Sequence, residues 1–164
     1  MTGPANRIAA ALRAPGETVA VAEGSAGGLI SAALLSVPGA SAYYLGGAVI
    51  YTAAASRAFM AGPIDVPAGM RGATEEFATY IARSAAAQLG ATWGLGEAGA
   101  AGPPNRYGDP SGHCWLAIAG PSEATRHVLT GSDGREENMV AFAAAALDLL
   151  LEVLEARLDR PDHI

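Results

Sequence analysis

Two glutamates stand at the ends of apolar runs that are typical of buried strands. Glu23 follows the run 18–22, and Glu97 lies near the end of the run 92–98. We expect these runs to be neighbouring inner strands, with both carboxylates at the same end, facing the mouth of a pocket. Two carboxylates held close in a partly dry site have pKa values that are pushed apart, which suits one as an acid and the other as a base. Alternatively, Glu23 caps nearby backbone N–H groups, and Glu97 lies in water at a loop mouth or pairs with an arginine.

A small-residue turn separates Glu23 from the helix predicted over 26–36. In α/β proteins, ligands collect where a parallel strand ends and a helix begins, because the helix N-terminus offers N–H groups and a partial positive charge. We therefore expect Gly24, Ser25, Gly27 and Gly28 to bind a ligand. The turn has neither the Lys-Ser/Thr ending of a P-loop nor the spacing of a dinucleotide fingerprint, so as a motif it does not identify the ligand.

The remaining pattern predicts one domain, residues 1–164, with a core over about 5–157 and a short polar tail. Its apolar periodicity and its turn residues indicate a three-layer α/β/α sandwich with a mixed β-sheet. Gly46–Gly47 marks a bulge or a close contact, and Gly62–Pro63 marks a helix end. Residues 120–123 join an antiparallel hairpin. The expected helices span 5–14, 26–36, 53–61, about 74–90 and 135–157, and the expected strands span 17–22, 42–51, 92–98, 113–119 and 124–130.

Successive segments resemble the signatures of the CinA C-terminal domain family, which includes nicotinamide mononucleotide deamidases. The resemblance runs from about residue 5 to residue 155. It is carried by Ala22–Gly28, Val37–Tyr44, Gly47–Tyr51, Arg71–Ala73, Gly99–Pro103 and Arg135–Glu137.

The chain departs from that family where the resemblance would place catalysis. The family's elbow resembles Ala-Glu-Ser-Cys-Thr-Gly-Gly, and Gly24 stands at the nucleophilic serine. Ser56 stands at the lysine that activates it, and Ala98 stands at a further hydroxyl residue. The chain has no lysine at all, and arginine cannot be deprotonated in a protein, so a Ser–Lys dyad is excluded. Ser25 is one position late and could replace the serine only through a rearranged turn.

The resemblance also implies residues that bind a ligand. Tyr51 and Thr52 match pocket positions, and Arg135 matches an arginine that reaches a phosphate, in some cases across a subunit contact. The loop 103–112 carries larger side chains than the family has there. Arg106 could pair with an anion and Tyr107 could stack on a ring beside Asn105, or the loop is a solvated turn.

Three functions stay open at this stage. The first is the inherited deamidase, which the loss of nucleophile and base opposes. The second is a repurposed enzyme that uses Glu23 and Glu97 as acid and base on a small organic or nucleotide-like substrate. The third is a non-catalytic protein that binds a pyridine nucleotide or serves as an interaction module.

The composition limits which classes of partner, metal and cofactor we expect. The formal charge is −6 and no basic stripe is present, which argues against nucleic acid. No apolar run reaches the length of a membrane helix and no secretory signal is visible, so we expect a cytoplasmic protein. The single Cys114 reads as a core residue, the three histidines are scattered, and we expect no metal and no cofactor. The family resemblance suggests a homo-oligomer.

Overall fold

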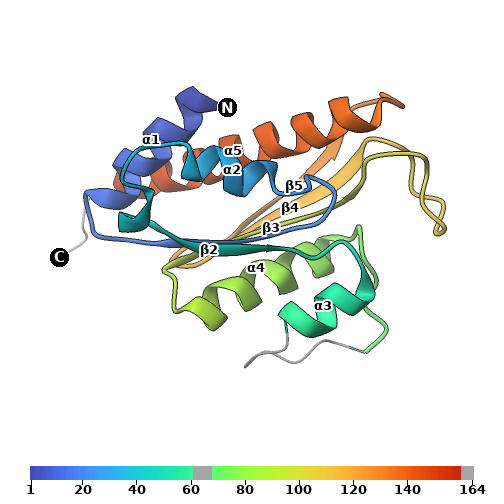
Figure 1. Ribbon diagram of the computed structural model, residues 1–164, viewed down its shortest axis with the longest axis horizontal. Helices are drawn as coiled ribbons and strands as arrows, with labels where there is room; N and C mark the ends of the chain where they lie inside the picture. Colours follow the sequence, from blue (N-terminus) through green and yellow to red (C-terminus); the bar gives the residue numbers. More distant parts are fainter. Residues whose placement is uncertain (61–67, 160–164) are drawn as a thin grey trace.

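The computed structural model describes residues 1–60 and 68–159. One sheet with strand order β2-β1-β3-β4-β5 forms the middle layer. Helices α1, α2 and α5 cover one face, and α3 and α4 lie on the other (Figure 1). This arrangement confirms the predicted α/β class and the mixed sheet, because β1 pairs in parallel with β2 and β3 whereas β4 runs antiparallel to β3 and β5.

The element bounds are close to those expected from the sequence. The helices are α1 (Thr2–Arg13), α2 (Leu29–Leu35), α3 (Ala53–Phe59), α4 (Glu75–Leu89) and α5 (Arg135–Leu158), with a 3₁₀ turn at Ala40–Ala42. The strands are β1 (Val19–Glu23), β2 (Tyr44–Val49), β3 (Trp93–Ala100), β4 (His113–Ala119) and β5 (Ala124–Leu129). The pairing of β1 with β2 shifts register around Leu45, next to the predicted bulge. The helix end expected at Gly62–Pro63 lies outside the described residues.

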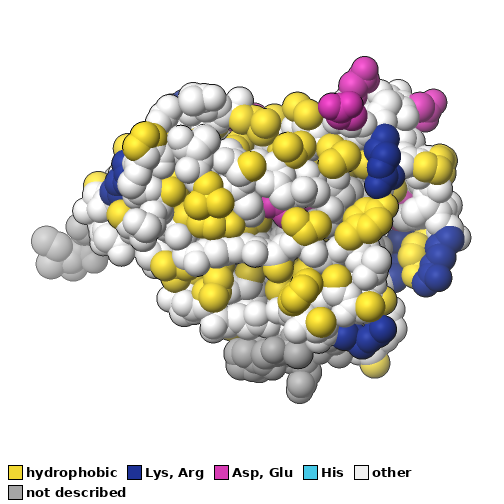
Figure 2. Space-filling model, in the orientation of Figure 1, with side chains coloured by type: hydrophobic (Ala, Val, Ile, Leu, Met, Phe, Trp, Pro, Cys, Tyr) yellow, Lys and Arg dark blue, Asp and Glu magenta, His cyan; other side chains and the backbone are white. Residues whose placement is uncertain are grey.

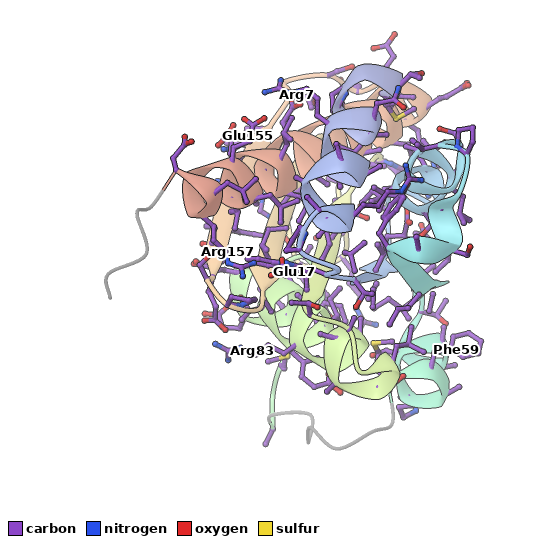
Figure 3. The ribbon with its side chains drawn as sticks, turned by 90° about the vertical axis from the view of Figure 1, so that its left-hand side faces the viewer. Arg7, Glu17, Phe59, Arg83, Glu155 and Arg157 are labelled. Carbon is purple, nitrogen blue, oxygen red and sulfur yellow. The ribbon has the colours of Figure 1, made fainter. Side chains whose placement is uncertain are left out.

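The two edges of the sheet differ in character. β2 is one edge, and the molecular face over it shows scattered hydrophobic side chains, with most charged groups toward its rim (Figure 2). β5 is the other edge, and there Arg126 pairs with Glu152 of α5 at 2.5 Å. Two further ion pairs hold α5: Arg7 of α1 pairs with Glu155, and Glu17, in the loop between α1 and β1, pairs with Arg157 (Figure 3).

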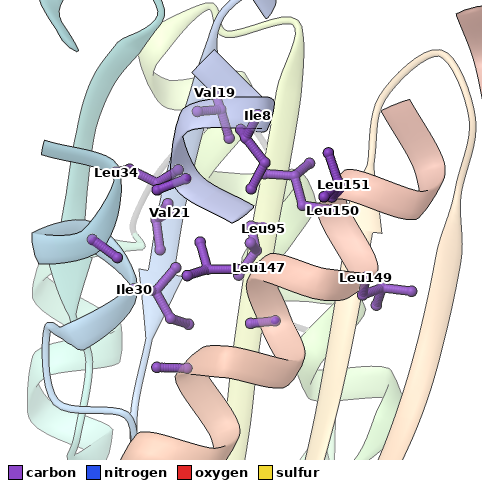
Figure 4. Close-up of a cluster of buried hydrophobic side chains, with 14 of the residues drawn as sticks. Ile8, Val19, Val21, Ile30, Leu34, Leu95, Leu147, Leu149, Leu150 and Leu151 are labelled. Carbon is purple, nitrogen blue, oxygen red and sulfur yellow. The ribbon is translucent and has the colours of Figure 1, made fainter. Parts of the chain in front are cut away.

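The larger core lies between the sheet and α1, α2 and α5. Side chains of alternating strand residues meet the apolar stripes of these helices there (Figure 4). Val19 and Val21 of β1 and Leu95 of β3 belong to this core, whereas Ala20 and Ala22 face α4. Because side chains alternate along a strand, Glu23 and Glu97 must point to the same face as these core residues.

No helix among residues 1–60 and 68–159 is long and apolar enough to cross a membrane.

Candidate functional site

Glu23 and Glu97 are direct partners in the register of β1 and β3. The expectation that they lie side by side at one end of two strands is therefore met. We also expected them to face a pocket mouth, and here the structure differs, because both residues have 0% exposed surface. Neither carboxylate lines the grooves of about 260, 250 and 300 Å³ that the described residues form elsewhere on the molecule.

Glu23 holds the start of α2. Its Oε1 accepts hydrogen bonds from the backbone N–H groups of Gly28 at 2.7 Å and Ile30 at 3.1 Å. Its Oε2 accepts from the N–H of Ser31 at 2.9 Å and from the Ser31 hydroxyl at 2.8 Å. The capping role considered for Glu23 is thus what the structure shows. The N–H groups that we expected to receive a ligand anion are already used by a carboxylate of the chain itself.

Glu97 holds the turn that precedes α2. Its Oε2 accepts from the N–H groups of Gly24 at 2.9 Å and Ala26 at 2.7 Å. Its Oε1 accepts from the Ser25 hydroxyl at 2.5 Å and from the Cys114 thiol at 3.4 Å. Burial raises the pKa of Glu97, although these hydrogen bonds favour the charged form and oppose part of that rise. The alternative expectation, that Glu97 lies in water or pairs with an arginine, is therefore wrong.

Cys114 is a core residue, as expected, and its thiol also contacts the Glu97 carboxylate. Burial raises the pKa of its thiol well above the usual value, and the nearby Glu97 adds to that rise. A thiol with a raised pKa is a poor nucleophile, so the contact with Glu97 is structural.

Arg135 and Tyr51, two of the residues expected to bind a ligand, form an exposed pair. Arg135, the first residue of α5, donates to the Tyr51 hydroxyl at 2.8 Å and to the carbonyl of Gly102. Its guanidinium carbon lies 5.7 Å from the centroid of the Tyr51 ring. Tyr51 is 60% exposed, so this pair faces solvent. A planar guanidinium has five N–H donors, and these two bonds leave others for an anion.

The turn after β1 lies against the same end of α5. Gly27 has a φ of 67°, and a Cβ on it would stand 2.8 Å from Cε of Met139, one helical turn after Arg135. Gly24, by contrast, is partly exposed, and a Cβ there would meet only the carbonyl oxygen of Glu97, at 3.5 Å. The structure thus places Gly27 near the start of α5, the helix that carries Arg135, whereas Gly24 lies against Glu97 and Gly28 against Val49. Ser25 is 5% exposed and is turned toward Glu97.

Thr52 has a local role. Its hydroxyl accepts from the N–H of Ala55 at 3.1 Å and so caps α3. Ser56, at the family's lysine position, lies within that helix.

The loop residues Asn105, Arg106 and Tyr107 form a separate cluster with Arg71 and Asp109. The Asn105 side chain accepts from the N–H groups of Tyr107 and Asp109, and Arg71 binds Asp109 at 2.6 and 3.3 Å. The guanidinium carbons of Arg71 and Arg106 lie 4.8 and 4.9 Å from the centroid of the Tyr107 ring. The hydrogen bond from Arg71 lowers the pKa of Asp109. The loop is therefore tied to the segment before α4, and its binding role stays a prediction.

Sequence reasoning missed two features near the site. The histidines were expected to be scattered, but Nδ1 of His113 lies 2.7 Å from Nε2 of His127 across the β4–β5 hairpin. Nε2 of His113 also bonds the carbonyl of Ala73. The hairpin register, which pairs Trp115 with His127, could have indicated this contact. Among the residues described, no group of three or more possible ligands could hold a metal ion.

Asn138 is the second missed residue. It is fully buried, and its amide donates to the carbonyls of Ala101 and Ser132. These bonds fix the start of α5, which carries Arg135, against the end of β3. The signal in the sequence was an amide within the apolar stripe of the last helix.

Comparison with known proteins decides the family. The family model described as the CinA C-terminal domain matches residues 2–154. This chain belongs to the CinA C-terminal domain family. A CinA-like protein of Myxococcus xanthus is 36% identical over 147 residues, which is 88% of this chain and 35% of that relative. A CinA-like protein of Anaeromyxobacter sp. strain K is 36% identical over 143 residues, or 85% of this chain and 35% of the relative. The CinA domain described here thus spans about a third of these relatives.

Solved structures of the CinA superfamily share the fold. The competence/damage inducible protein CihA from Agrobacterium tumefaciens superimposes with a TM-score of 0.83 at 27% identity, over 94% of each chain. A CinA superfamily protein from Klebsiella pneumoniae gives a TM-score of 0.85 at 24% identity, over 94% of this chain and 98% of that one. At that lower identity the likeness concerns the CinA fold alone.

Proposed function

We propose that this CinA domain binds a small anionic, nucleotide-like molecule at the rim formed by Arg135, Tyr51 and the turn at Gly24. The observation that carries the proposal is the Arg135 guanidinium, which Tyr51 and Gly102 hold at the carboxyl ends of the parallel strands. Ligands of open α/β sheets bind at that end of the strands. An arginine oriented by two fixed partners is suited to a phosphate or a carboxylate.

The internal carboxylates support this assignment by exclusion. Glu23 occupies the backbone donors at the start of α2, and Glu97 occupies those of Gly24 and Ala26. An anion at the start of α2 would find these N–H groups already bonded and two carboxylates beside them. The anionic group of the ligand therefore binds Arg135, and the two glutamates position the turn.

Hydrolysis by the family's dyad has no support in these residues. Gly24 has no hydroxyl and Ser56 has no amine, and no lysine occurs anywhere in the sequence. A nucleophile and its base act as one unit, so the loss of both removes most of the rate. We infer a binding domain without amide hydrolysis.

One observation favours a second candidate, the repurposed acid–base enzyme. The Ser25 hydroxyl lies 2.5 Å from Glu97, and burial raises the pKa of this carboxyl. A buried carboxyl whose pKa is raised keeps a proton more readily than an exposed one, and in this candidate Ser25 passes that proton toward the rim. In this candidate, Glu97 is the proton-transfer group and Glu23 only holds its surroundings.

Incubation of the purified protein with nicotinamide mononucleotide separates these functions. We expect the nucleotide to raise the melting temperature with no release of ammonia. Ammonia release by the unaltered protein would overturn the proposal. If that release is lost in Glu97→Gln and reduced in Ser25→Ala, proton transfer from Glu97 through Ser25 is the mechanism.

A gain-of-function variant provides the matched control. Gly24→Ser fits the space found at that position, and Ser56→Lys adds the missing amine. We expect the double variant to release ammonia at a measurable rate, while Gly24→Ser alone does not. Such a result attributes the inactivity of the natural chain to two absent groups in a pocket that is otherwise intact.

A further inference from the structure

Two arginine–tyrosine pairs of the same construction occur in this chain. In the first, Nη2 of Arg135 donates to the Tyr51 hydroxyl at 2.8 Å, and the guanidinium carbon lies 5.7 Å from the ring centroid. In the second, Nη2 of Arg106 donates to the Tyr107 hydroxyl at 2.7 Å, and the guanidinium carbon lies 4.9 Å from that ring centroid. Both tyrosines are exposed, at 60% and 47%. The first pair belongs to the proposed rim, whereas the second lies in the loop 103–112.

Gly102 connects the two pairs. Its carbonyl accepts a hydrogen bond from Arg135, and Arg106 follows it by four residues. Four residues of chain span at most about 14 Å, so the two long arginine side chains lie within reach of one small molecule. The base of the loop is closed by a bond from the Gly112 N–H to the carbonyl of Ala100 at 2.9 Å. The loop, drawn in yellow between β3 and β4, projects beyond the sheet and presents Arg106 at the end where Arg135 lies (Figure 1).

Neither arginine is neutralised by an acid of the described chain. Five other arginines form ion pairs with Asp or Glu: Arg7, Arg71, Arg83, Arg126 and Arg157. Within residues 1–60 and 68–159, no ion pair joins Arg106 or Arg135 to a carboxylate. The chain has no lysine, so the dark-blue groups in Figure 2 are arginines, and most of those visible lie on the side where the loop projects. In a chain of net charge −6, these two cations are available for the anionic groups of a ligand.

The backbone around Arg106 is fixed by bonds within the loop. The Asn105 side chain accepts from the N–H groups of Tyr107 at 3.0 Å and Asp109 at 3.1 Å. Asp109 in turn binds Arg71, in the segment before α4, at 2.6 Å. The Arg106 side chain itself is exposed and bonds its neighbour in the chain, Tyr107. A loop that is ordered beforehand loses little conformational entropy when a ligand binds, so this one is suited to selecting a ligand.

We propose that the anionic part of the ligand is a diphosphate, with one phosphate bound by Arg135 and the other by Arg106. Arg135 is common to both sites, so this inference rests on the proposed function. Two separate guanidiniums, each held by a tyrosine hydroxyl, match two phosphate groups in a way that one guanidinium does not. The ligand is therefore a nucleotide that contains a diphosphate, and the loop 103–112 selects it over a mononucleotide.

The number of phosphate groups, rather than the total charge, distinguishes the two kinds of nucleotide. A terminal phosphate carries a charge of about −1.5 to −2 at neutral pH, and each bridging phosphate of a dinucleotide is singly charged. A site with one arginine therefore binds both with similar strength, whereas a second arginine adds a charge-assisted hydrogen bond to the diphosphate alone. Nicotinamide mononucleotide is one half of nicotinamide adenine dinucleotide, so these two molecules form a matched pair of probes.

Calorimetric titration with the two nucleotides tests this inference. We expect the unaltered protein to bind the dinucleotide at least about tenfold more tightly than the mononucleotide. In Arg106→Gln, the dinucleotide should bind at least about tenfold more weakly, while the affinity for the mononucleotide stays within about twofold. The matched control is Arg83→Gln, which removes the same charge from α4, where Arg83 pairs with Glu123 of the turn 120–123 at the opposite end of the sheet. It should leave both affinities unchanged.

Three results contradict the inference while the proposed function stands, provided that the mononucleotide still binds through Arg135. They are equal affinity of the unaltered protein for the two nucleotides, a dinucleotide affinity that Arg106→Gln leaves unchanged, and equal losses in Arg106→Gln and Arg83→Gln. If the mononucleotide does not bind, the proposed function fails, and inorganic pyrophosphate and phosphate then test the two arginines alone. Pyrophosphate should raise the melting temperature more than phosphate does at equal concentration, and Arg106→Gln should remove that difference. No difference, or one that persists in Arg106→Gln, sinks the diphosphate site.

Discussion

The candidate site has a buried floor, formed by Glu23 and Glu97, and an exposed rim, formed by Arg135 and Tyr51. The two use charged side chains in opposite ways. At the floor, Glu23 and Glu97 have no exposed surface, and each of their carboxylate oxygens accepts two hydrogen bonds from the chain itself. At the rim, Arg135 is exposed and uses two bonds, to Tyr51 and Gly102, that orient it toward solvent. The carboxylates at the floor are satisfied by the chain itself, whereas the guanidinium at the rim has N–H groups beyond those two bonds.

This difference shows how residue type can mislead about role. Carboxylates at the ends of parallel strands suggest catalysis, because ligands bind there. A carboxylate that already neutralises the N–H groups of a helix start has little capacity for a substrate. The roles of floor and rim can be separated by measuring stability and ligand binding in the same variants.

The largest expected effect is on stability at the floor. Glu23→Ala leaves three backbone N–H groups and the Ser31 hydroxyl without their acceptor, and we expect a loss of roughly 4 kcal/mol in the free energy of unfolding. Urea unfolding measures it. Arg135→Ala is the rim counterpart and should unfold close to the unaltered protein. Equal losses in the two variants would contradict the separation of floor from rim.

Glutamine should distinguish the two glutamates. In Glu23→Gln, the amide nitrogen must face a backbone N–H group, since both carboxylate oxygens accept from one, and we expect a loss of roughly 2 kcal/mol. In Glu97→Gln, the amide oxygen can accept from Gly24 and Ala26 while the amide nitrogen donates to Ser25 and Cys114. That variant should lose less than about 1 kcal/mol. The reverse order in urea unfolding would show that the hydrogen-bond assignments are wrong.

Binding at the rim is the next effect in size. Arg135→Gln removes a charge-assisted bond to the ligand, and we expect the dissociation constant for nicotinamide mononucleotide to rise at least about tenfold. Calorimetric titration gives that constant. Arg57→Gln is a control on α3 that also removes one positive charge. A similar loss in both variants would indicate a general effect of net charge.

The pH dependence of stability should reveal Glu97. Because burial raises the pKa of Glu97 in the folded state, the folded chain binds the proton more tightly than the unfolded chain does. The stabilisation is fully present below the ordinary value of 4.5 and declines as the pH rises through the higher, folded pKa. Unfolding free energies measured across this window should fall more steeply for the unaltered protein than for Glu97→Gln. Parallel curves would mean that Glu97 does not titrate in this way.

The smallest effect should come from Tyr51→Phe. This change removes the hydroxyl that orients Arg135 but keeps the ring under the guanidinium. We expect the affinity for the nucleotide to fall only a few-fold, with no change in unfolding. A loss as large as that of Arg135→Gln would mean that the hydroxyl itself contacts the ligand.

The sequence predicted the sheet and its helices well because their signals are local. The runs 18–22 and 92–98, the hairpin at 120–123 and the stripe of the last helix each depend on neighbouring residues. It also predicted that Glu23 and Glu97 would be adjacent. It did not predict their burial, because that depends on how the 24–28 turn folds over both side chains. The Arg71–Asp109 and His113–His127 contacts likewise join segments whose distance is fixed only by the tertiary fold.

Calorimetric titration of nicotinamide mononucleotide into the unaltered protein, Glu97→Gln and Arg135→Gln tests the central claim most directly, with ammonia assayed in the same samples. We predict that the unaltered protein and Glu97→Gln bind with similar affinity, that Arg135→Gln binds at least about tenfold more weakly, and that none of them releases ammonia. The account is contradicted if Glu97→Gln loses binding or turnover while Arg135→Gln keeps it, because the buried carboxylate would then act on the ligand itself.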